Sequence, residues 1–91
     1  MIYADAAQLV LDDLGKTWTN GTLAVFPAGF EDDGAFAVRF GRSEWVKDGD
    51  VMHMPISGAV ALVGKATQQV SLISYTANPE RIDAMTPTAT A

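Results

Sequence analysis

The first fourteen residues carry apolar side chains at the spacing of an amphipathic helix. An apolar residue recurs every three or four positions, at Ile2, Ala6, Leu9, Val10 and Leu14. This spacing places them along one side of a helix and predicts a helix over residues 3–14. Gly15 follows where helices commonly end, because glycine readily adopts a positive φ.

Four later segments have the composition or the alternation of β-strands, and turn-forming residues separate them. They span residues 22–26, 35–40, 59–63 and 69–75. In the second segment Phe36, Val38 and Phe40 point to one side, so we expect a sheet with one buried face. We expect the other face to be flat and lined by small residues, namely Ala35, Ala37, Ala59 and Ala61.

The segments between the strands are less regular. Residues 28–34 read as a polar loop, and Trp45 with Val46 reads as an extension of the second strand beyond Gly41. Residues 47–50 predict a turn, whereas residues 51–56 contain a proline and make a poor central strand. Asn78-Pro79-Glu80 is typical of a helix start, and Ile82 and Met85 are placed to dock that helix on the sheet.

These elements predict an α+β fold. The N-terminal helix should pack on a four-stranded antiparallel sheet, and a short helix should close the C-terminal end. The length of 91 residues is that of one domain. We expect the domain to span residues 1–86 and residues 87–91 to form a flexible tail, because the last residues show no periodicity.

The composition and net charge of the chain limit which partners and which cellular compartment we expect. The net charge of −5 would repel phosphate groups, so nucleic acid and anionic membranes are not expected as partners. The same charge would attract a basic protein, although it is also sufficient to keep a small domain in solution. The chain has no cysteine and no apolar run long enough to span a membrane, so we expect a cytoplasmic protein.

No pattern of catalytic residues is present, so we do not expect an enzyme. His53 is the only histidine, and a metal site would need several ligands that converge on it. Gly29 and Gly34 lack the Lys-Ser/Thr that would complete a phosphate-binding loop. We therefore expect no cofactor, no metal and no catalytic residues.

Acidic turns and an aromatic residue make the best candidate binding site. The candidate partner-binding residues are Glu31, Asp32, Asp33, Trp45, Asp48 and Asp50. The carboxylates would pair with basic groups of a partner, and the tryptophan would anchor the contact. The simpler interpretation is that these loop acids are only solvated. The flat sheet face or an open edge strand could also bind a second copy and form a homodimer.

The stretch from Phe36 to Met85 resembles the YrhB family, also described as the immunity protein 35 family. The similarity lies in the aromatic strand 36–40 with Ser43, the Trp45…Gly49-Asp50 turn, the apolar strand 59–63 after Pro55, and the closing segment 78–82. The resemblance implies a small cytoplasmic α+β protein that neutralises a toxin by binding it. It implies no catalytic residues.

The sequence therefore suggests two alternative functions, of which the first is preferred. The first is a non-enzymatic binding module that resembles an immunity protein and occludes a toxin, its partner being a basic toxin domain. The alternative is a small phage or prophage accessory protein that binds a host factor or assembles with itself.

Overall fold

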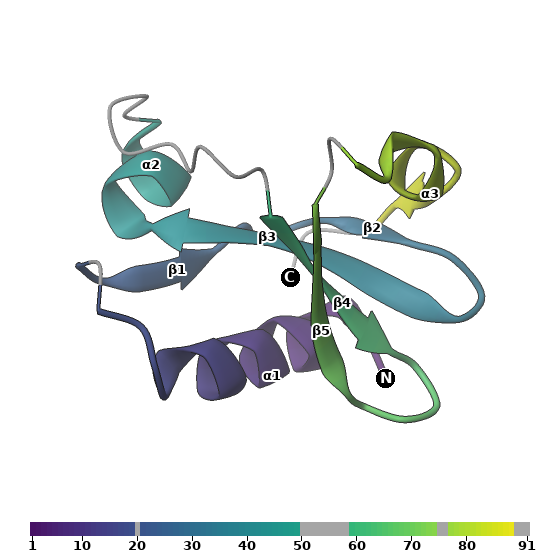
Figure 1. Ribbon diagram of the computed structural model, residues 1–91, viewed down its shortest axis with the longest axis horizontal. Helices are drawn as coiled ribbons and strands as arrows, with labels where there is room; N and C mark the ends of the chain where they lie inside the picture. Colours follow the sequence, from purple (N-terminus) through teal and green to yellow (C-terminus); the bar gives the residue numbers. More distant parts are fainter. Residues whose placement is uncertain (20, 50–58, 75–76, 89–91) are drawn as a thin grey trace.

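The computed structural model describes residues 1–19, 21–49, 59–74 and 77–88, and these form three layers. Helix α1 covers one face of an antiparallel sheet, and the short helices α2 and α3 lie on the other side (Figure 1). The elements in chain order are α1 (Tyr3–Gly15), β1 (Leu23–Val25), β2 (Phe30–Glu31), β3 (Ala35–Arg42), α2 (Ser43–Asp48), β4 (Ala59–Gly64), β5 (Val70–Ser74), α3 (Pro79–Asp83) and β6 (Thr86–Pro87). The predicted α+β architecture, with its N-terminal helix on an antiparallel sheet and its short C-terminal helix, is confirmed.

Helix α1 faces the sheet with a stripe that differs from the predicted one. Its buried residues are Tyr3, Ala6, Ala7 and Val10, whereas Ile2 is 66% exposed. Tyr3 takes the inward position because its hydroxyl donates a hydrogen bond of 2.8 Å to the carbonyl of Phe26. Burial raises the pKa of this phenol to about 12. The start of the helix is thereby tied to the segment between β1 and β2.

The sheet contains six strands within the described residues, so the prediction of four was too low. The strand order is β5-β4-β3-β2-β6, and β1 pairs with β3 on the same side as β2. The two missed strands, β2 and β6, have two residues each, which is too short for an alternating pattern. Strand β6 includes Pro87, which we had predicted to lie in a flexible tail. In the structure Pro87 pairs with Phe30 of β2.

Residues 43–48 form helix α2 where an extended strand was expected. The segment begins with Ser43-Glu44 and ends with Lys47-Asp48 before Gly49, which caps the helix at φ +71°. The residues that favour a helix start and a helix end thus lie within one six-residue segment. Six residues are too few to show the 3.6-residue period of a helix. The predicted turn at 47–50 coincides with this cap as far as Gly49, and residues 50–58 lie outside the described residues.

Both faces of the sheet are largely buried, so the expected flat outer face is not present. On the α1 side, Phe36, Val38 and Phe40 pack with Val10 and Val63. On the other side α3 docks as predicted: Ile82 and Met85 cover Ala37 and Val60. The register pairs Val38 with Ala61, so Ala61 belongs to the α1 side rather than to the face of Ala37.

Candidate protein-binding surface

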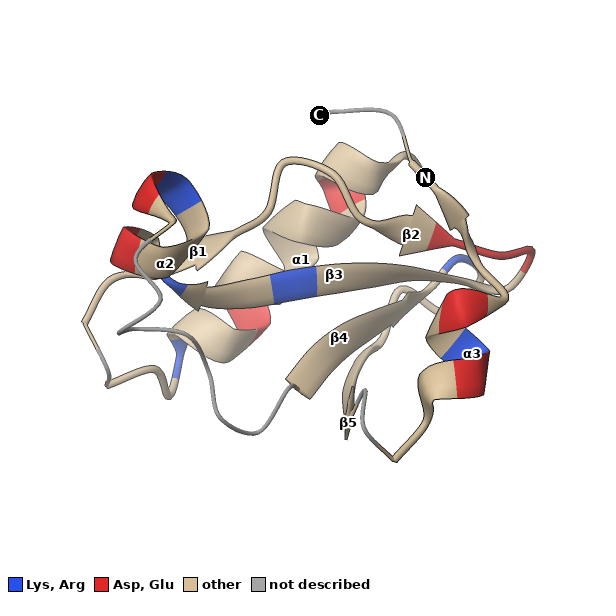
Figure 2. Ribbon diagram, turned by 90° about the horizontal axis from the view of Figure 1, so that it is seen from above, with Lys and Arg blue, Asp and Glu red and all other residues tan. Residues whose placement is uncertain are grey.

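The structure places the residues predicted to bind a partner at opposite ends of β3. Glu31, Asp32 and Asp33 lie at the turn between β2 and β3, while Trp45 and Asp48 belong to α2 beyond the far end of β3 (Figure 2). Asp50 lies outside the described residues. These residues therefore do not form one contiguous surface, and their role in binding stays a prediction.

Glu31 is engaged within the chain. Its carboxylate lies 2.9 Å from the Nζ atom of Lys65, in the connection between β4 and β5. The same ammonium group lies 4.8 Å from the centre of the Phe36 ring, in the range of a cation–π contact. The charge of Glu31 is thus balanced by a cation from a different part of the chain.

Asp32 holds the β2–β3 turn and α3 together. Its Oδ1 atom accepts hydrogen bonds of 2.9 Å from the backbone N–H groups of Gly34 and Ala35, and its Oδ2 atom lies 3.1 Å from Arg81. Partial burial acts to raise the pKa of this carboxyl, but the two backbone hydrogen bonds and the charges of Arg81 and Lys65 outweigh it. The pKa of Asp32 therefore lies below its ordinary value.

Trp45 has a structural role in the placement of α2. Its ring meets the ring of Phe26 edge to face, with the centroids 5.0 Å apart. The guanidinium of Arg39 lies 4.2 Å from the centre of the same Phe26 ring, so that ring is flanked by two groups. Trp45 remains only half-buried, and Asp48 is exposed at the end of the helix.

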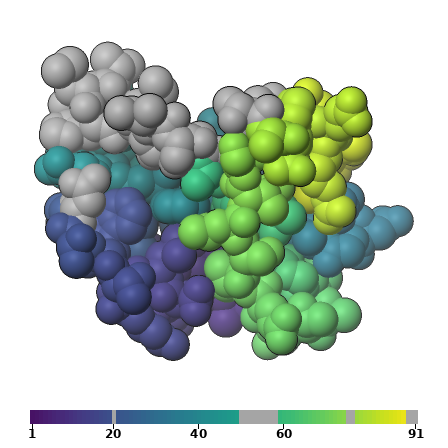
Figure 3. Space-filling view, viewed as in Figure 1, coloured from purple at the N-terminus to yellow at the C-terminus, as the bar shows by residue number. Residues whose placement is uncertain are grey.

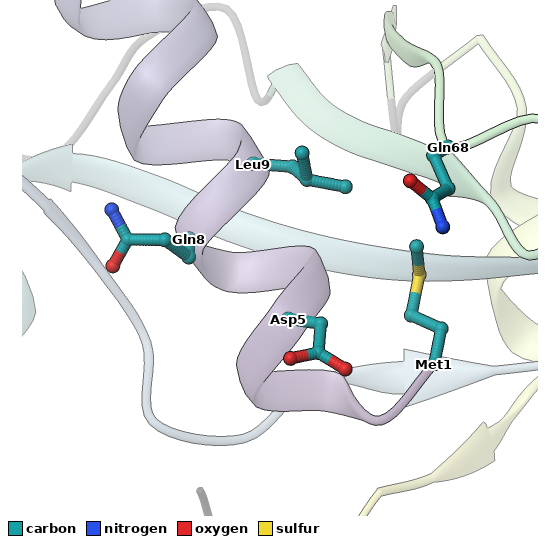
Figure 4. A pocket seen from close by; sticks show the side chains of 5 residues that line it. All are labelled: Met1, Asp5, Gln8, Leu9 and Gln68. Atoms are coloured by element: carbon teal, nitrogen blue, oxygen red, sulfur yellow. The ribbon is translucent and has the colours of Figure 1, made fainter.

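A groove runs between α1 and the β4–β5 connection, and sequence analysis did not find it. It consists of two open recesses, of about 380 Å³ and about 400 Å³, that share Leu9 and Gln68. Figure 4 shows the first recess, with Leu9 and Met1 turned toward Gln68 across from the helix. The other residues that line the groove are Asp5, Gln8, Asp12, Asp13, Lys16, Gln69 and Val70. We call this surface the α1–β5 groove.

Strand β5 borders the groove and is the last strand of the sheet on this side. No other described strand pairs with its outer edge. Leu72 points to the α1 side, as its partner Ala61 does, yet it is 52% exposed because α1 does not cover it. Figure 3 shows β5, in light green, at the molecular surface. An uncovered strand edge with an exposed apolar side chain is a common protein-binding feature.

Gln68 adds an unusual backbone conformation to the groove. Its φ is +57°, and it is the one residue other than glycine with a positive φ in the described part of the chain. Such positions normally favour glycine or asparagine, so the side chain is present at a cost in backbone strain. The signal available from the sequence was the spacing of Asp5, Leu9 and Asp12 on one helix, which is not specific without the strand beside it.

The groove presents carboxylates, amides and apolar side chains, with Lys16 as its one cation. Among the described residues no three histidine or acidic side chains converge as a metal site would require. None of the helices that the structure describes has the length and apolar character needed to cross a membrane. Comparisons of the chain with protein-family models, with curated proteins and with solved structures gave no match.

Proposed function

We propose that this protein is a non-enzymatic binding module whose partner is a basic protein. The observation that carries the proposal is the outer edge of β5, with which no described strand pairs, beside a groove rimmed by Asp5, Asp12 and Asp13. A strand edge offers backbone hydrogen bonds, and the carboxylates favour lysine and arginine. The net charge of −5 would also speed the encounter with a basic partner.

The kind of binding that we propose is toxin neutralisation by occlusion. The resemblance of residues 36–85 to the YrhB, or immunity protein 35, family supports this proposal, because such proteins act by covering a toxin in the cytoplasm. Occlusion requires no reacting group on the binding protein. The α1–β5 groove fits that requirement, since its lining is carboxylates, amides and apolar side chains around a single lysine.

The test is co-purification from the native host, followed by a toxicity assay. We expect the tagged protein to capture a basic protein encoded by a neighbouring gene. Expression of that partner alone should arrest growth, and co-expression of this protein should restore it. Failure to recover a basic protein, together with the absence of a toxin gene beside this one, would overturn the proposal.

A matched pair of variants locates the surface. The double change Asp12→Asn with Asp13→Asn should weaken capture by about tenfold or more, because it removes two charges from the groove. Asp33→Asn with Asp48→Asn makes the same change in net charge at exposed positions of the other two regions. If that second pair abolished capture and the first did not, the binding surface would lie at the residues predicted from the sequence.

The uncovered β5 edge also favours a second candidate function. A small phage or prophage accessory protein could use the edge to assemble with itself or to bind a host factor. Light scattering distinguishes self-assembly, which predicts a dimer or larger species at micromolar concentration. A monomer at all accessible concentrations would exclude the self-assembling form of this function.

A further inference from the structure

The outer edge of β5 presents backbone groups in a defined pattern. Gly64 donates a hydrogen bond of 3.1 Å to the carbonyl of Gln69, so these two residues form a hydrogen-bonded pair of the β4–β5 hairpin. Such pairs alternate along an antiparallel ladder, which makes Ser71 and Ile73 the next residues that bond to β4. The N–H and C=O groups of Val70 and Leu72 therefore point away from β4, toward the free edge.

The described residues of this edge include no charged side chain and no proline to protect it. Charged residues, prolines and bulges commonly prevent one sheet edge from pairing with another chain. Strand β5 has the sequence Val-Ser-Leu-Ile-Ser and contains neither a charged residue nor a proline. The other end of the sheet differs, because β6 there has only two residues and one of them is Pro87. The edge of β5 is thus the better of the two for addition of a strand.

The groove beside β5 indicates which side chains an added strand would carry. A strand paired with β5 would lie about 4.8 Å from it, and every second side chain would face the α1 layer. Those side chains would meet Leu72 and the recess lined by Leu9 and Val70, which favours apolar residues. Asp12 and Asp13 line the same recess and are exposed, which favours lysine or arginine at its rim.

Charge argues against a second copy as the occupant. Strand β5 contains no basic residue, and Lys65 in the neighbouring connection is already paired with Glu31. Two copies paired through β5 would each bring an acidic α1 to the interface without cations to match, apart from Lys16. An extended basic segment supplies the complementary charge that a second copy lacks.

We infer that β5 binds an extended segment of a partner protein as an additional strand. The side chains of this segment that face α1, at every second position, include both apolar residues and lysine or arginine. This inference rests on the proposed function and names the form of its partner. Backbone hydrogen bonds to Val70 and Leu72 give the segment its register, Leu72 and Leu9 receive its apolar side chains, and Asp12 and Asp13 pair with its cations.

The probe for this mode of binding is a short peptide, blocked at both ends, that has valine and lysine at successive positions on one face and threonine between them (Val-Thr-Lys-Thr-Val-Thr-Lys). We expect it to shift the amide NMR signals of Val70, Leu72 and the groove face of α1. Hydrogen exchange at the amides of Val70 and Leu72 should slow by about tenfold or more at saturation, because these groups become bonded. The same peptide with glutamate in place of each lysine should bind at least about tenfold more weakly.

Variants of β5 separate the backbone contribution from the side-chain contribution. Leu72→Pro removes the outward N–H group and should abolish peptide binding, whereas Leu72→Ile keeps that group and should retain it. If Leu72→Pro does not fold, the exchange measurement on the unaltered protein decides instead. Asp12→Asn with Asp13→Asn should weaken binding, and Asp33→Asn with Asp48→Asn should not.

Three results would overturn strand addition without overturning the proposed function. One is capture of a basic protein from the host while the peptide leaves Val70 and Leu72 unchanged, which indicates recognition of a folded surface. Another is equal binding of the lysine and glutamate peptides. The third is slow exchange at Val70 and Leu72 in a dimer without peptide, which identifies a second copy as the occupant.

Discussion

Two acidic regions of this protein differ in how their carboxylates are used. In the turn cluster, which we define as Glu31, Asp32, Lys65 and Arg81, two carboxylates are paired with two cations from distant parts of the chain. In the α1–β5 groove, Asp5, Asp12 and Asp13 are exposed and share the lining with one cation, Lys16. Figure 2 shows the turn cluster and α1 in different parts of the molecule.

The comparison shows that a run of acids in the sequence need not be a binding site. The carboxylate of Asp32 accepts hydrogen bonds from the backbone of its own turn and pairs with Arg81. Of the acids of α1, Asp5 lies seven positions before Asp12, and Asp13 follows Asp12 directly, a pattern that does not by itself indicate a binding site. These acids nevertheless lie beside a strand edge that no described strand pairs with. Asp5 accepts a hydrogen bond from the Ile2 N–H group and Asp12 accepts one from Gln8, so Asp13, which is exposed, is the carboxylate of the groove most available to a partner.

Among the changes near the turn cluster, Gly29→Ala should cause the largest loss of stability. Gly29 precedes β2, and an added Cβ would overlap the backbone carbonyl of Ala37 and lie 2.7 Å from Cε1 of Tyr3. We expect a loss of about 2–4 kcal/mol in the free energy of unfolding, measured by urea denaturation. Gly15→Ala, at the end of α1 with nothing within 4 Å of the new Cβ, is the control and should not destabilise the protein. Equal effects would contradict this account.

Removal of one carboxylate from each region tests the comparison directly. Asp32→Ala should lower the free energy of unfolding by about 1–2 kcal/mol, because it removes two backbone hydrogen bonds and the contact with Arg81. Asp13→Ala, at an exposed position of α1, should change it by less than about 0.5 kcal/mol. Thermal or urea unfolding of the two variants under the same conditions gives the answer. A larger loss for Asp13→Ala would reverse the assignment of the two regions.

Acid should remove the contribution of Asp32 gradually. Because the pKa of Asp32 is lower in the folded protein than in the unfolded chain, its charge stabilises the fold above the unfolded value of about 3.9. That stabilisation is lost as the pH falls below this value and through the folded pKa. The difference in unfolding free energy between the unaltered protein and Asp32→Asn should therefore shrink between pH 6 and pH 2. A difference independent of pH would show that the charge of Asp32 contributes nothing.

The smallest effect concerns strain in the groove. Gln68→Gly should raise the free energy of unfolding by about 0.5 kcal/mol, because relief of the strain at φ +57° exceeds the extra freedom of glycine in the unfolded chain. Gln68→Ala keeps the strain and should give no such gain. The melting temperatures of the two variants provide the measurement. A gain for alanine equal to that for glycine would mean that the backbone at this position is not strained.

Much of the fold was predictable because long periodic segments carry their own signal. The helix at the start of the chain and the strands that became β3, β4 and β5 each contain enough residues to show a period. The short elements were not predictable on that basis. Strand β2 has two residues that pair with β3 only because Gly29 permits the close approach to Ala37 and Tyr3. Helix α2 was mistaken for a strand because six residues cannot distinguish the two periods.

The candidate surface was less predictable than the fold. The sequence drew attention to acids in turns and to Trp45, but it contains no information about which carboxylates will find a cation. Lys65 and Glu31 are 34 positions apart, and their pairing depends on the register that aligns Ala35 with Gly64. The exposure of Leu72 likewise depends on how far α1 extends beneath the sheet, which alternation in β5 cannot report.

By itself, the sequence determined the class of fold, the acidic charge and the order of the long helix and the long strands, because these follow from local periodicity and composition. Only the tertiary structure decided which acids are paired within the chain, which sheet edge remains open and where a groove forms. Those features depend on contacts between residues far apart in the sequence, and such contacts exist only after the strands have taken their register.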